Sequence, residues 1–233
     1  MRLGNGSEEM IVRVRLFAIL RERAGRDALE LRLRSGATVA DAMRALSETP
    51  PLGELLNRLP VQMAVNREYA TTDTLLAPDD ELALIPPVSG GGEDPGDRTG
   101  KREQLHVRVG REPLSIERLS RAVADPRAGA IVIFQGMTRE VERLDYEAYV
   151  EMAERRIEQI MGDCIAAHGL RRGAAEHRVG AVALGEPSVI VAVSAAHRDE
   201  AFAGARDAID RIKAEAPIWK REHAGEGAGA WLP

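Results

Sequence analysis

The sequence predicts an α+β protein of two domains joined by a flexible linker. Short runs of alternating apolar and polar residues, typical of half-buried strands, occur between longer runs with helical spacing. Residues 89–101, SGGGEDPGDRTGK, include five glycines and no large apolar residue, so they cannot bury surface. A length of 233 residues, with 44% apolar residues, allows two globular domains. We place these domains at 10–91 and 103–233, and the linker at 92–102.

The first domain follows the order ββαββ. Period-2 alternation predicts strands over 11–16 and 29–33, with a short helix over 18–23 between them. Thr38 is expected to cap a helix that continues through Leu46. Further strands are predicted over 61–65 and 81–85. A small mixed sheet with one crossing helix is typical of the β-grasp, or ubiquitin-like, fold.

The second domain reads as an α+β domain. Strands are predicted over 105–109, 129–134, 143–149, 178–182 and 188–194, and helices over 115–123, 151–168 and 198–214. Gly169 is expected to end the second of these helices, and Pro217 to stop the third.

Composition narrows the classes of function. The net charge is −5 and neither half is strongly basic, which argues against nucleic acid as a partner. Cys164 is the only cysteine, so no internal disulfide or zinc cluster is expected, and its place on an apolar helix stripe predicts a core residue. We expect no bound metal. Residues 1–9 lack the apolar core of a signal peptide, and the apolar stretch 179–196 is interrupted, so we expect a cytoplasmic protein without membrane spans.

The end of the first domain is a candidate functional segment. Two prolines stiffen the exit from the last strand, and Gly90 and Gly91 then give a thin tail without side chains. Such a tail could enter a narrow active site of another protein. The alternative is that these glycines only begin the linker, but their position directly after a β-grasp domain favours the tail.

Lysine is rare in this chain. Only Lys101, Lys213 and Lys220 occur among 32 basic residues. At 100° per residue, Lys213 lies about 20° from Phe202 around the 198–214 helix, which predicts that it points toward the buried face. Burial lowers the pKa of an amine and makes it a usable base or nucleophile. An equally weighted alternative is that Lys213 extends into solvent from the last turn of the helix.

Three further candidates are considered in addition to Lys213. Lys220 follows Pro217, which turns the chain, so it can return to the neighbourhood of Lys213. His197 and Arg198 stand at the start of the 198–214 helix, where free N–H groups suit an anion such as phosphate. Arg139 follows the 129–134 strand and is a possible second anion ligand. Each of these residues could instead be simply solvated.

Several stretches of the chain resemble molybdopterin synthase. The tail IPPVSGG and residues 10–91 as a whole are similar to its small, sulfur-carrier subunit. The second domain is similar to its large subunit in GAIVIFQGMTR (129–139), LDYEAYVEMA (144–153), VSAAHRDEAF (193–202) and KAEAPIWKRE (213–222). The last two stretches, in this order, are specific.

The resemblance implies a sulfurtransferase of molybdenum cofactor biosynthesis, made as a fusion. In that family a terminal glycine carries sulfur as a thiocarboxylate, and two sulfurs added to cyclic pyranopterin monophosphate give the dithiolene of molybdopterin. It implies no tightly bound cofactor, an adenylating, sulfur-loading enzyme as a partner, and a homodimer through the large-subunit domain. By position it implies Lys213 and Lys220 as catalytic residues, Arg139, His197 and Arg198 as substrate ligands, and Gly90 and Gly91 as the carrier tail.

This chain departs from the family pattern in two places. Gly91 is internal and has no free carboxylate, and the segment between Arg139 and Tyr146 is shorter than the family usually has. A rival interpretation is a non-catalytic ubiquitin-like carrier fused to a degenerate pterin-binding scaffold. A third is that the large half works with separate carriers. The presence of both lysines together with His197-Arg198 favours a working synthase. The sequence leaves open whether the chain is cut, by which protease, and which enzyme loads the sulfur.

Overall fold

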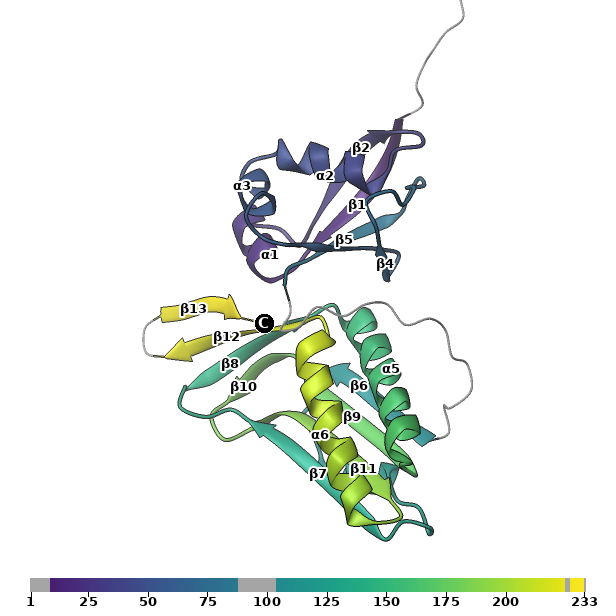
Figure 1. Ribbon diagram of the computed structural model, residues 1–233. Helices are drawn as coiled ribbons and strands as arrows, with labels where there is room; N and C mark the ends of the chain where they lie inside the picture. Colours follow the sequence, from purple (N-terminus) through teal and green to yellow (C-terminus); the bar gives the residue numbers. More distant parts are fainter. Residues whose placement is uncertain (1–8, 88–103, 225–226, 233) are drawn as a thin grey trace, which may run out of the picture. The chain divides into compact units, whose positions relative to one another are not determined.

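The computed structural model describes residues 9–87, 104–224 and 227–232 (Figure 1). The chain divides into two compact units at Pro87/Val88, and each is described by itself. Gly90, Gly91 and the predicted linker at 92–102 lie outside the described residues. Within the described part of the chain, no helix has the length and apolarity needed to cross a membrane.

The first unit is a five-stranded sheet crossed by helices, which confirms the β-grasp prediction (Figure 1). Its elements are β1 (Glu9–Leu16), α1 (Ala18–Ala24), β2 (Ala28–Arg34), α2 (Val39–Ser47), α3 (Leu52–Leu56), β3 (Gln62–Val65), β4 (Glu68–Ala70) and β5 (Glu81–Ile85). The strand order is β2-β1-β5-β3-β4. Strand β1 pairs antiparallel with β2 and parallel with β5, so the last strand of the unit lies in the middle of the sheet.

Local sequence explains the main helix of this unit. Thr38 caps α2 in a capping box, in which its hydroxyl accepts from the Asp41 amide while the Asp41 carboxylate accepts from the Thr38 amide. The buried face of α2, with Val39, Ala42 and Leu46, packs on the apolar face of the sheet. The short elements α3 and β4 were not predicted, because five and three residues are too few to show a periodicity.

The second unit contains two four-stranded sheets and three helices. Its elements are β6 (Leu105–Gly110), α4 (Ile116–Ala122), β7 (Ala130–Met137), β8 (Arg143–Ala148), α5 (Val150–His168), β9 (Arg172–Arg178), β10 (Gly180–Ala183), β11 (Pro187–Ala195), α6 (Arg198–Glu215), β12 (Ile218–Ala224) and β13 (Gly227–Leu232). The sheets have the orders β6-β9-β11-β7 and β10-β8-β12-β13. Helices α5 and α6 lie side by side on one face of the first sheet (Figure 1), and α4 packs on its other face.

The core between α5, α6 and the first sheet follows the helical spacing read from the sequence. Ala153, Ile157, Ile160 and Cys164 are all fully buried, so the prediction that Cys164 is a core residue is confirmed. Burial and the nearby carboxylate of Asp207 raise the pKa of the Cys164 thiol to about 12. Gly169 ends α5 with φ +62°, a left-handed conformation that glycine adopts without a steric penalty.

Three strands of the second unit were missed, and one was misplaced. Strand β9 is buried, but its apolar residues are small alanines and do not alternate with polar residues. Strands β12 and β13 form a hairpin in a glycine-rich sequence. The strand predicted over 178–182 is the shorter β10, Gly180–Ala183. Two of the missed strands, β9 and β12, carry side chains of the pocket described below, so part of this pocket could not be predicted either.

Strand β9 is fixed by a buried carboxylate. Glu176 is fully buried and accepts hydrogen bonds from Arg108 at 2.6 Å and from Arg118 at 2.6 and 2.7 Å, and its Oε1 lies 2.8 Å from His106 Nε2. Burial alone would raise the pKa of Glu176, but these hydrogen bonds outweigh it and bring the pKa down to about 2. The cluster ties β6 and α4 to β9 on the face of the sheet opposite α5 and α6. The next residue, His177, therefore points to the other face.

Candidate active site

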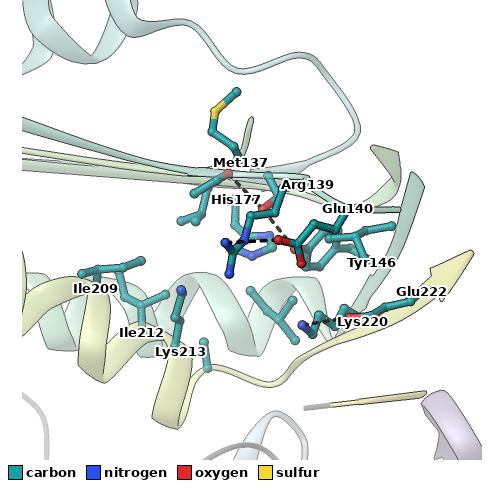
Figure 2. Close-up of a pocket in the computed structure, with 16 residues that line it drawn as sticks. Met137, Arg139, Glu140, Tyr146, His177, Ile209, Ile212, Lys213, Lys220 and Glu222 are labelled. Atoms are coloured by element: carbon teal, nitrogen blue, oxygen red, sulfur yellow. Dashed lines mark hydrogen bonds and ion pairs between the residues drawn. The ribbon is translucent and has the colours of Figure 1, made fainter. Parts of the chain in front are cut away.

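A pocket of about 400 Å³ lies where the end of α6 meets both sheets of the second unit (Figure 2). Both sheets contribute residues, because β7, β9 and β11 belong to the first and β8 and β12 to the second. The lining residues are Gly136, Met137, Arg139, Glu140, Leu144, Tyr146, His177, Ser188, Val189, Ile209, Ile212, Lys213, Ala216, Ile218, Lys220 and Glu222. A concave site of this volume that combines apolar walls with a few polar groups is typical of a small-molecule site.

Lys213 and Lys220 both line this pocket, as the turn predicted at Pro217 required. Lys213 lies in the last turn of α6, and its Nζ is 5.8 Å from the centroid of the Phe134 ring. Lys220 lies in β12, with its Nζ 3.5 Å from Oε1 of Glu222. Figure 2 shows both lysine side chains directed into the pocket from different elements.

The prediction that Lys213 points toward the buried face of α6 was based on a wrong marker residue. Phe202, used as the marker of the buried face of α6, is 63% exposed. The buried face is made of Ala201, Gly204, Ala205, Ala208, Ile209 and Ile212. Lys213 itself is exposed, at the mouth of the pocket, and does not belong to the buried face.

Arg139 lines the same pocket from the loop after β7. Its side chain is 82% exposed, and its Nη1 lies 3.6 Å from Oε1 of Glu140. Glu140 has φ +64°, a strained conformation for a residue with a side chain, in the short connection between β7 and β8. The guanidinium therefore stands at the solvent side of the pocket, where a charged group of a ligand could reach it.

His197 and Arg198 do not line this pocket. They lie at the N-terminal end of α6, and Arg198 is 15 residues from Lys213, or about 22 Å along the helix axis. The Arg198 side chain is 83% exposed, with Asp199 as an ion-pair partner at 3.7 Å. Within one chain, the structure separates the two halves of the predicted site.

Tyr146, His177 and Ser188 are among the pocket residues that the sequence analysis missed. His177 lies on the unrecognised strand β9, and Tyr146 shares a face of β8 with Leu144. The signal for Tyr146 is the period-2 pattern of β8, which puts both residues on one face. The antiparallel pairing of Tyr146 with Lys220 that brings it to the site cannot be read from one sequence.

His177 is a buried, neutral group. Its side chain sits against Tyr146 with ring centroids 5.0 Å apart and an interplanar angle of 72°. Burial lowers the pKa of His177 to about 4; a hydrogen bond with the Arg178 carbonyl opposes this effect, and the charge of Lys213 adds to it. Burial also raises the pKa of Tyr146, whose hydroxyl donates to Ser188 Oγ at 3.0 Å.

Comparisons with known proteins agree with this division of the chain. Residues 109–215 match the family model described as MoaE protein, and residues 14–91 match the ThiS family. The molybdopterin synthase catalytic subunit of Oryza sativa subsp. indica is 48% identical over 120 residues, covering 49% of this chain and 62% of the relative. Catalytic subunit 1 of Mycobacterium tuberculosis is 42% identical over 130 residues, covering 53% of this chain and 88% of the relative.

Solved structures support the same assignment of the second unit. The crystal structure of molybdopterin synthase from Staphylococcus aureus has a TM-score of 0.52 and 33% identity, covering 54% of this chain and 96% of that one. Molybdopterin cofactor biosynthesis protein E from Burkholderia multivorans has a TM-score of 0.50 and 30% identity, with coverage of 55% and 88%. The chain spans less than two thirds of the rice relative, but most of the bacterial ones. It therefore belongs to the molybdopterin synthase catalytic subunit family, with a ThiS-family, ubiquitin-like sulfur-carrier domain ahead of the catalytic domain.

Proposed function

We propose that this protein is a working molybdopterin synthase of molybdenum cofactor biosynthesis in the reducing cytoplasm. It would transfer two sulfurs, one from each of two loaded Gly91 thiocarboxylates, to cyclic pyranopterin monophosphate and so form the dithiolene of molybdopterin. The observation that carries the proposal is the meeting of Lys213 and Lys220 in one pocket. They are two of only three lysines in the chain, and they come from different elements.

The charges around the pocket suit the proposed reactants. Lys213, Lys220 and Arg139 supply hydrogen-bond donors to a phosphate and to a thiocarboxylate, both of which are anionic. The carboxylate of Glu140 lies beside Arg139, and that of Glu222 lies beside Lys220. The pocket volume of about 400 Å³ is in the range of sites for small ligands of this size.

Because Lys213 is exposed, we assign it the role of a point charge and donor. In each transfer, the thiocarboxylate sulfur forms a bond to a side-chain carbon of the pterin while a carbon–oxygen bond at that carbon breaks, and the oxygen leaves as water or, where it belongs to the cyclic phosphate, stays on the phosphate. The bond between that sulfur and the Gly91 carbonyl carbon then breaks, and water adds at this carbon to leave the Gly91 carboxylate. Negative charge develops on the carbonyl oxygen during this step, and preorganised ammonium groups stabilise such charge.

His197 and Arg198 fit the proposal only if a second copy supplies them. One chain holds Arg198 about 22 Å from Lys213, which is more than a small ligand spans. In a two-fold dimer the same end of α6 can face the pocket of the other copy. We therefore propose that each pocket combines Lys213, Lys220 and Arg139 of one protomer with His197 and Arg198 of its partner.

Conversion of the pterin by loaded protein tests the proposal against its rival. The protein, first cut after Gly91 so that this glycine has a free carboxyl group, is incubated with an adenylating, sulfur-loading enzyme, a sulfur source and cyclic pyranopterin monophosphate, and molybdopterin is measured. A working synthase gives molybdopterin, and a degenerate scaffold gives none even when the carrier tail is loaded. A parallel incubation also contains a separately made carrier. If molybdopterin forms only in this incubation, the second domain is active and the chain's own carrier domain is not.

A further inference from the structure

Three neutral side chains form the inner wall of the pocket, away from its cationic rim. We call His177, Tyr146 and Ser188 the floor, and Arg139, Lys213 and Lys220 the rim. Figure 2 shows the His177 ring and the Tyr146 ring together on the sheet side, opposite the two lysines. The floor residues come from β9, β8 and β11, which are strands of two sheets.

The orientation of the His177 ring fixes what it presents to a ligand. Its Nδ1 lies 2.9 Å from the Arg178 carbonyl oxygen, and since a carbonyl can only accept, Nδ1 carries the proton. The side chain is 8% exposed, and burial keeps it neutral. Nε2 is then a bare lone pair, and it makes no hydrogen bond within the described residues.

The tyrosine and serine of the floor direct their protons into the protein in the same way. The Ser188 hydroxyl donates its proton to the Gly136 carbonyl oxygen at 3.3 Å, so this proton is not available to another acceptor. The Tyr146 hydroxyl must then donate to Ser188 Oγ, at 3.0 Å. What remains on the Tyr146 oxygen is a lone pair, so it too can only accept a further hydrogen bond.

The floor therefore accepts hydrogen bonds, whereas the rim cations donate them. We propose that His177 Nε2 and the Tyr146 oxygen form a subsite for the N–H and O–H donors of the pterin ring system, a role that rests on the proposed function. The amino group and ring N–H groups of a pterin are donors, whereas the cyclic phosphodiester of the substrate is a monoanion without a proton and offers acceptors only. Phosphate is thus excluded from the floor and bound by the rim, and this separation sets the orientation of the substrate.

Binding measurements with two probes test this subsite. Dissociation constants for cyclic pyranopterin monophosphate and for inorganic phosphate are measured by calorimetry on the full chain and on His177→Phe and Tyr146→Phe. Each variant keeps a ring and removes one acceptor. We expect pterin affinity to fall about tenfold in each variant, since a lost hydrogen bond leaves a ligand donor unpaired. Phosphate affinity should stay the same, because the rim is untouched.

A spectroscopic measurement covers the case in which a buried substitution disturbs folding. In the wild-type protein, the ¹⁵N resonance of His177 Nε2 should report an unprotonated nitrogen and shift on addition of the pterin, but not of inorganic phosphate. Unchanged pterin affinity in both variants, or an Nε2 resonance that ignores bound pterin, overturns the subsite and leaves the proposed function intact. A wild-type protein that binds no pterin overturns both.

Discussion

Lys213 and Lys220 line one pocket although the end of α6 and a proline lie between them. The turn that joins them is held in place: the Tyr149 amide donates to the Pro217 carbonyl at 3.2 Å, and the Ile218 amide to that of Ala216 at 2.7 Å. Strand β12 then pairs with β8, which puts Lys220 directly opposite Tyr146. The relation between the two lysines is therefore set by backbone hydrogen bonds and does not depend on their own contacts.

Loss of the Lys213 amine should abolish conversion of the cyclic pterin without unfolding the protein. Lys213 is exposed, so Lys213→Ala should change the free energy of unfolding by less than about 0.5 kcal/mol. Lys213→Arg should fail as well, because a planar, delocalised guanidinium presents its charge and its donors in a different geometry from that of a compact ammonium group. Turnover of loaded protein and thermal unfolding are the two measurements.

Arg206→Ala is the matched control for Lys213. Arg206 is an exposed cation on the same helix, paired with Asp210, and it does not line the pocket. Its loss should leave turnover unchanged. Near-normal turnover of Lys213→Arg would remove the catalytic assignment, and an equal loss in Arg206→Ala would mean that charge on α6, and not this amine, is responsible.

Arg198→Ala should weaken binding of the phosphorylated pterin by about 1.5–3 kcal/mol if Arg198 donates to the phosphate. Affinity for an analogue without the phosphate should change less. Isothermal titration with both ligands measures the difference. Equal losses for the two ligands would show that Arg198 does not recognise the phosphate.

Mixed dimers test which copy supplies Arg198. If each pocket is shared between protomers, a dimer of Lys213→Ala with Arg198→Ala has one pocket with both defects and one intact pocket. At a pterin concentration too low to saturate Arg198→Ala, where each variant alone has little activity, random mixing of the two should then restore about a quarter of wild-type activity. If both residues serve the same chain's pocket, every mixed dimer carries two damaged pockets and no activity returns.

The sequence predicted the elements with a strong period and the residues that end them. Alternation located β1 and β5, and helical spacing with Gly169 and Pro217 located α5 and α6. It could not locate β9, in which the small residues Ala174 and Ala175 and the paired Glu176 are all buried, because such a strand looks polar in the sequence. Strand propensity is read from neighbouring residues along the chain, whereas β9 is stabilised by its partners in the adjacent strands of the sheet.

The sequence predicted the site residues that a turn of the chain brings together. It missed the site residues that are brought together by the pairing of strands. Lys220 was reached through Pro217, whereas His177 and Tyr146 needed the register of β9 and β8. The sequence analysis placed Arg198 and Lys213 in one site, although the length of the predicted helix already separates them by about 22 Å, and a role shared between two copies is invisible in one sequence.

Glu176→Gln should destabilise the second unit in a pH-dependent way. The folded pKa of about 2 lies below the ordinary value of 4.5, so the ionised carboxylate stabilises the fold above pH 4.5, and this stabilisation is lost as the pH falls from 4.5 to 2. We expect a loss of about 2 kcal/mol at pH 7, because the hydrogen bonds from Arg108 and Arg118 weaken when the acceptor is neutral. The difference between variant and wild type should shrink toward pH 2.

Urea unfolding at pH 7 and at acidic pH measures this effect, with Glu117→Gln as the control. Glu117 pairs with Arg121 on the surface of α4 and both side chains are exposed, so its loss should cost less than about 0.5 kcal/mol at either pH. A Glu176→Gln protein whose deficit is the same at both pH values would contradict the linkage.

Sulfur loading should require a cut after Gly91. A thiocarboxylate needs a free terminal carboxyl group, whereas Gly91 is joined to Gly92 by a peptide bond. Its sequence surroundings are rich in glycine and acidic residues, a composition that proteases cut readily. We expect intact-mass measurement of protein from its native cell to find a carrier that ends at Gly91 and a large subunit that begins at Gly92.

The sheet of the first unit explains why the cut would leave a usable carrier. Strand β5 lies between β1 and β3 and ends at the fully buried Ile85, so the base of the tail is fixed. The six residues from Pro86 to Gly91 extend by at most about 20 Å, which is enough for a thin tail to enter a pocket. Gly91→Leu should block both cutting and loading, because a side chain then occupies the end of that tail.

A separately made carrier ending at Gly91 distinguishes a failure to cut from a damaged catalytic unit. Added to the Gly91→Leu chain with activating enzyme and sulfur source, it should restore molybdopterin formation, since Lys213 and Lys220 are unchanged. Without it, the uncut chain should make none. If the uncut Gly91→Leu chain makes molybdopterin on its own, sulfur does not travel on Gly91, and the carrier role of this tail is wrong.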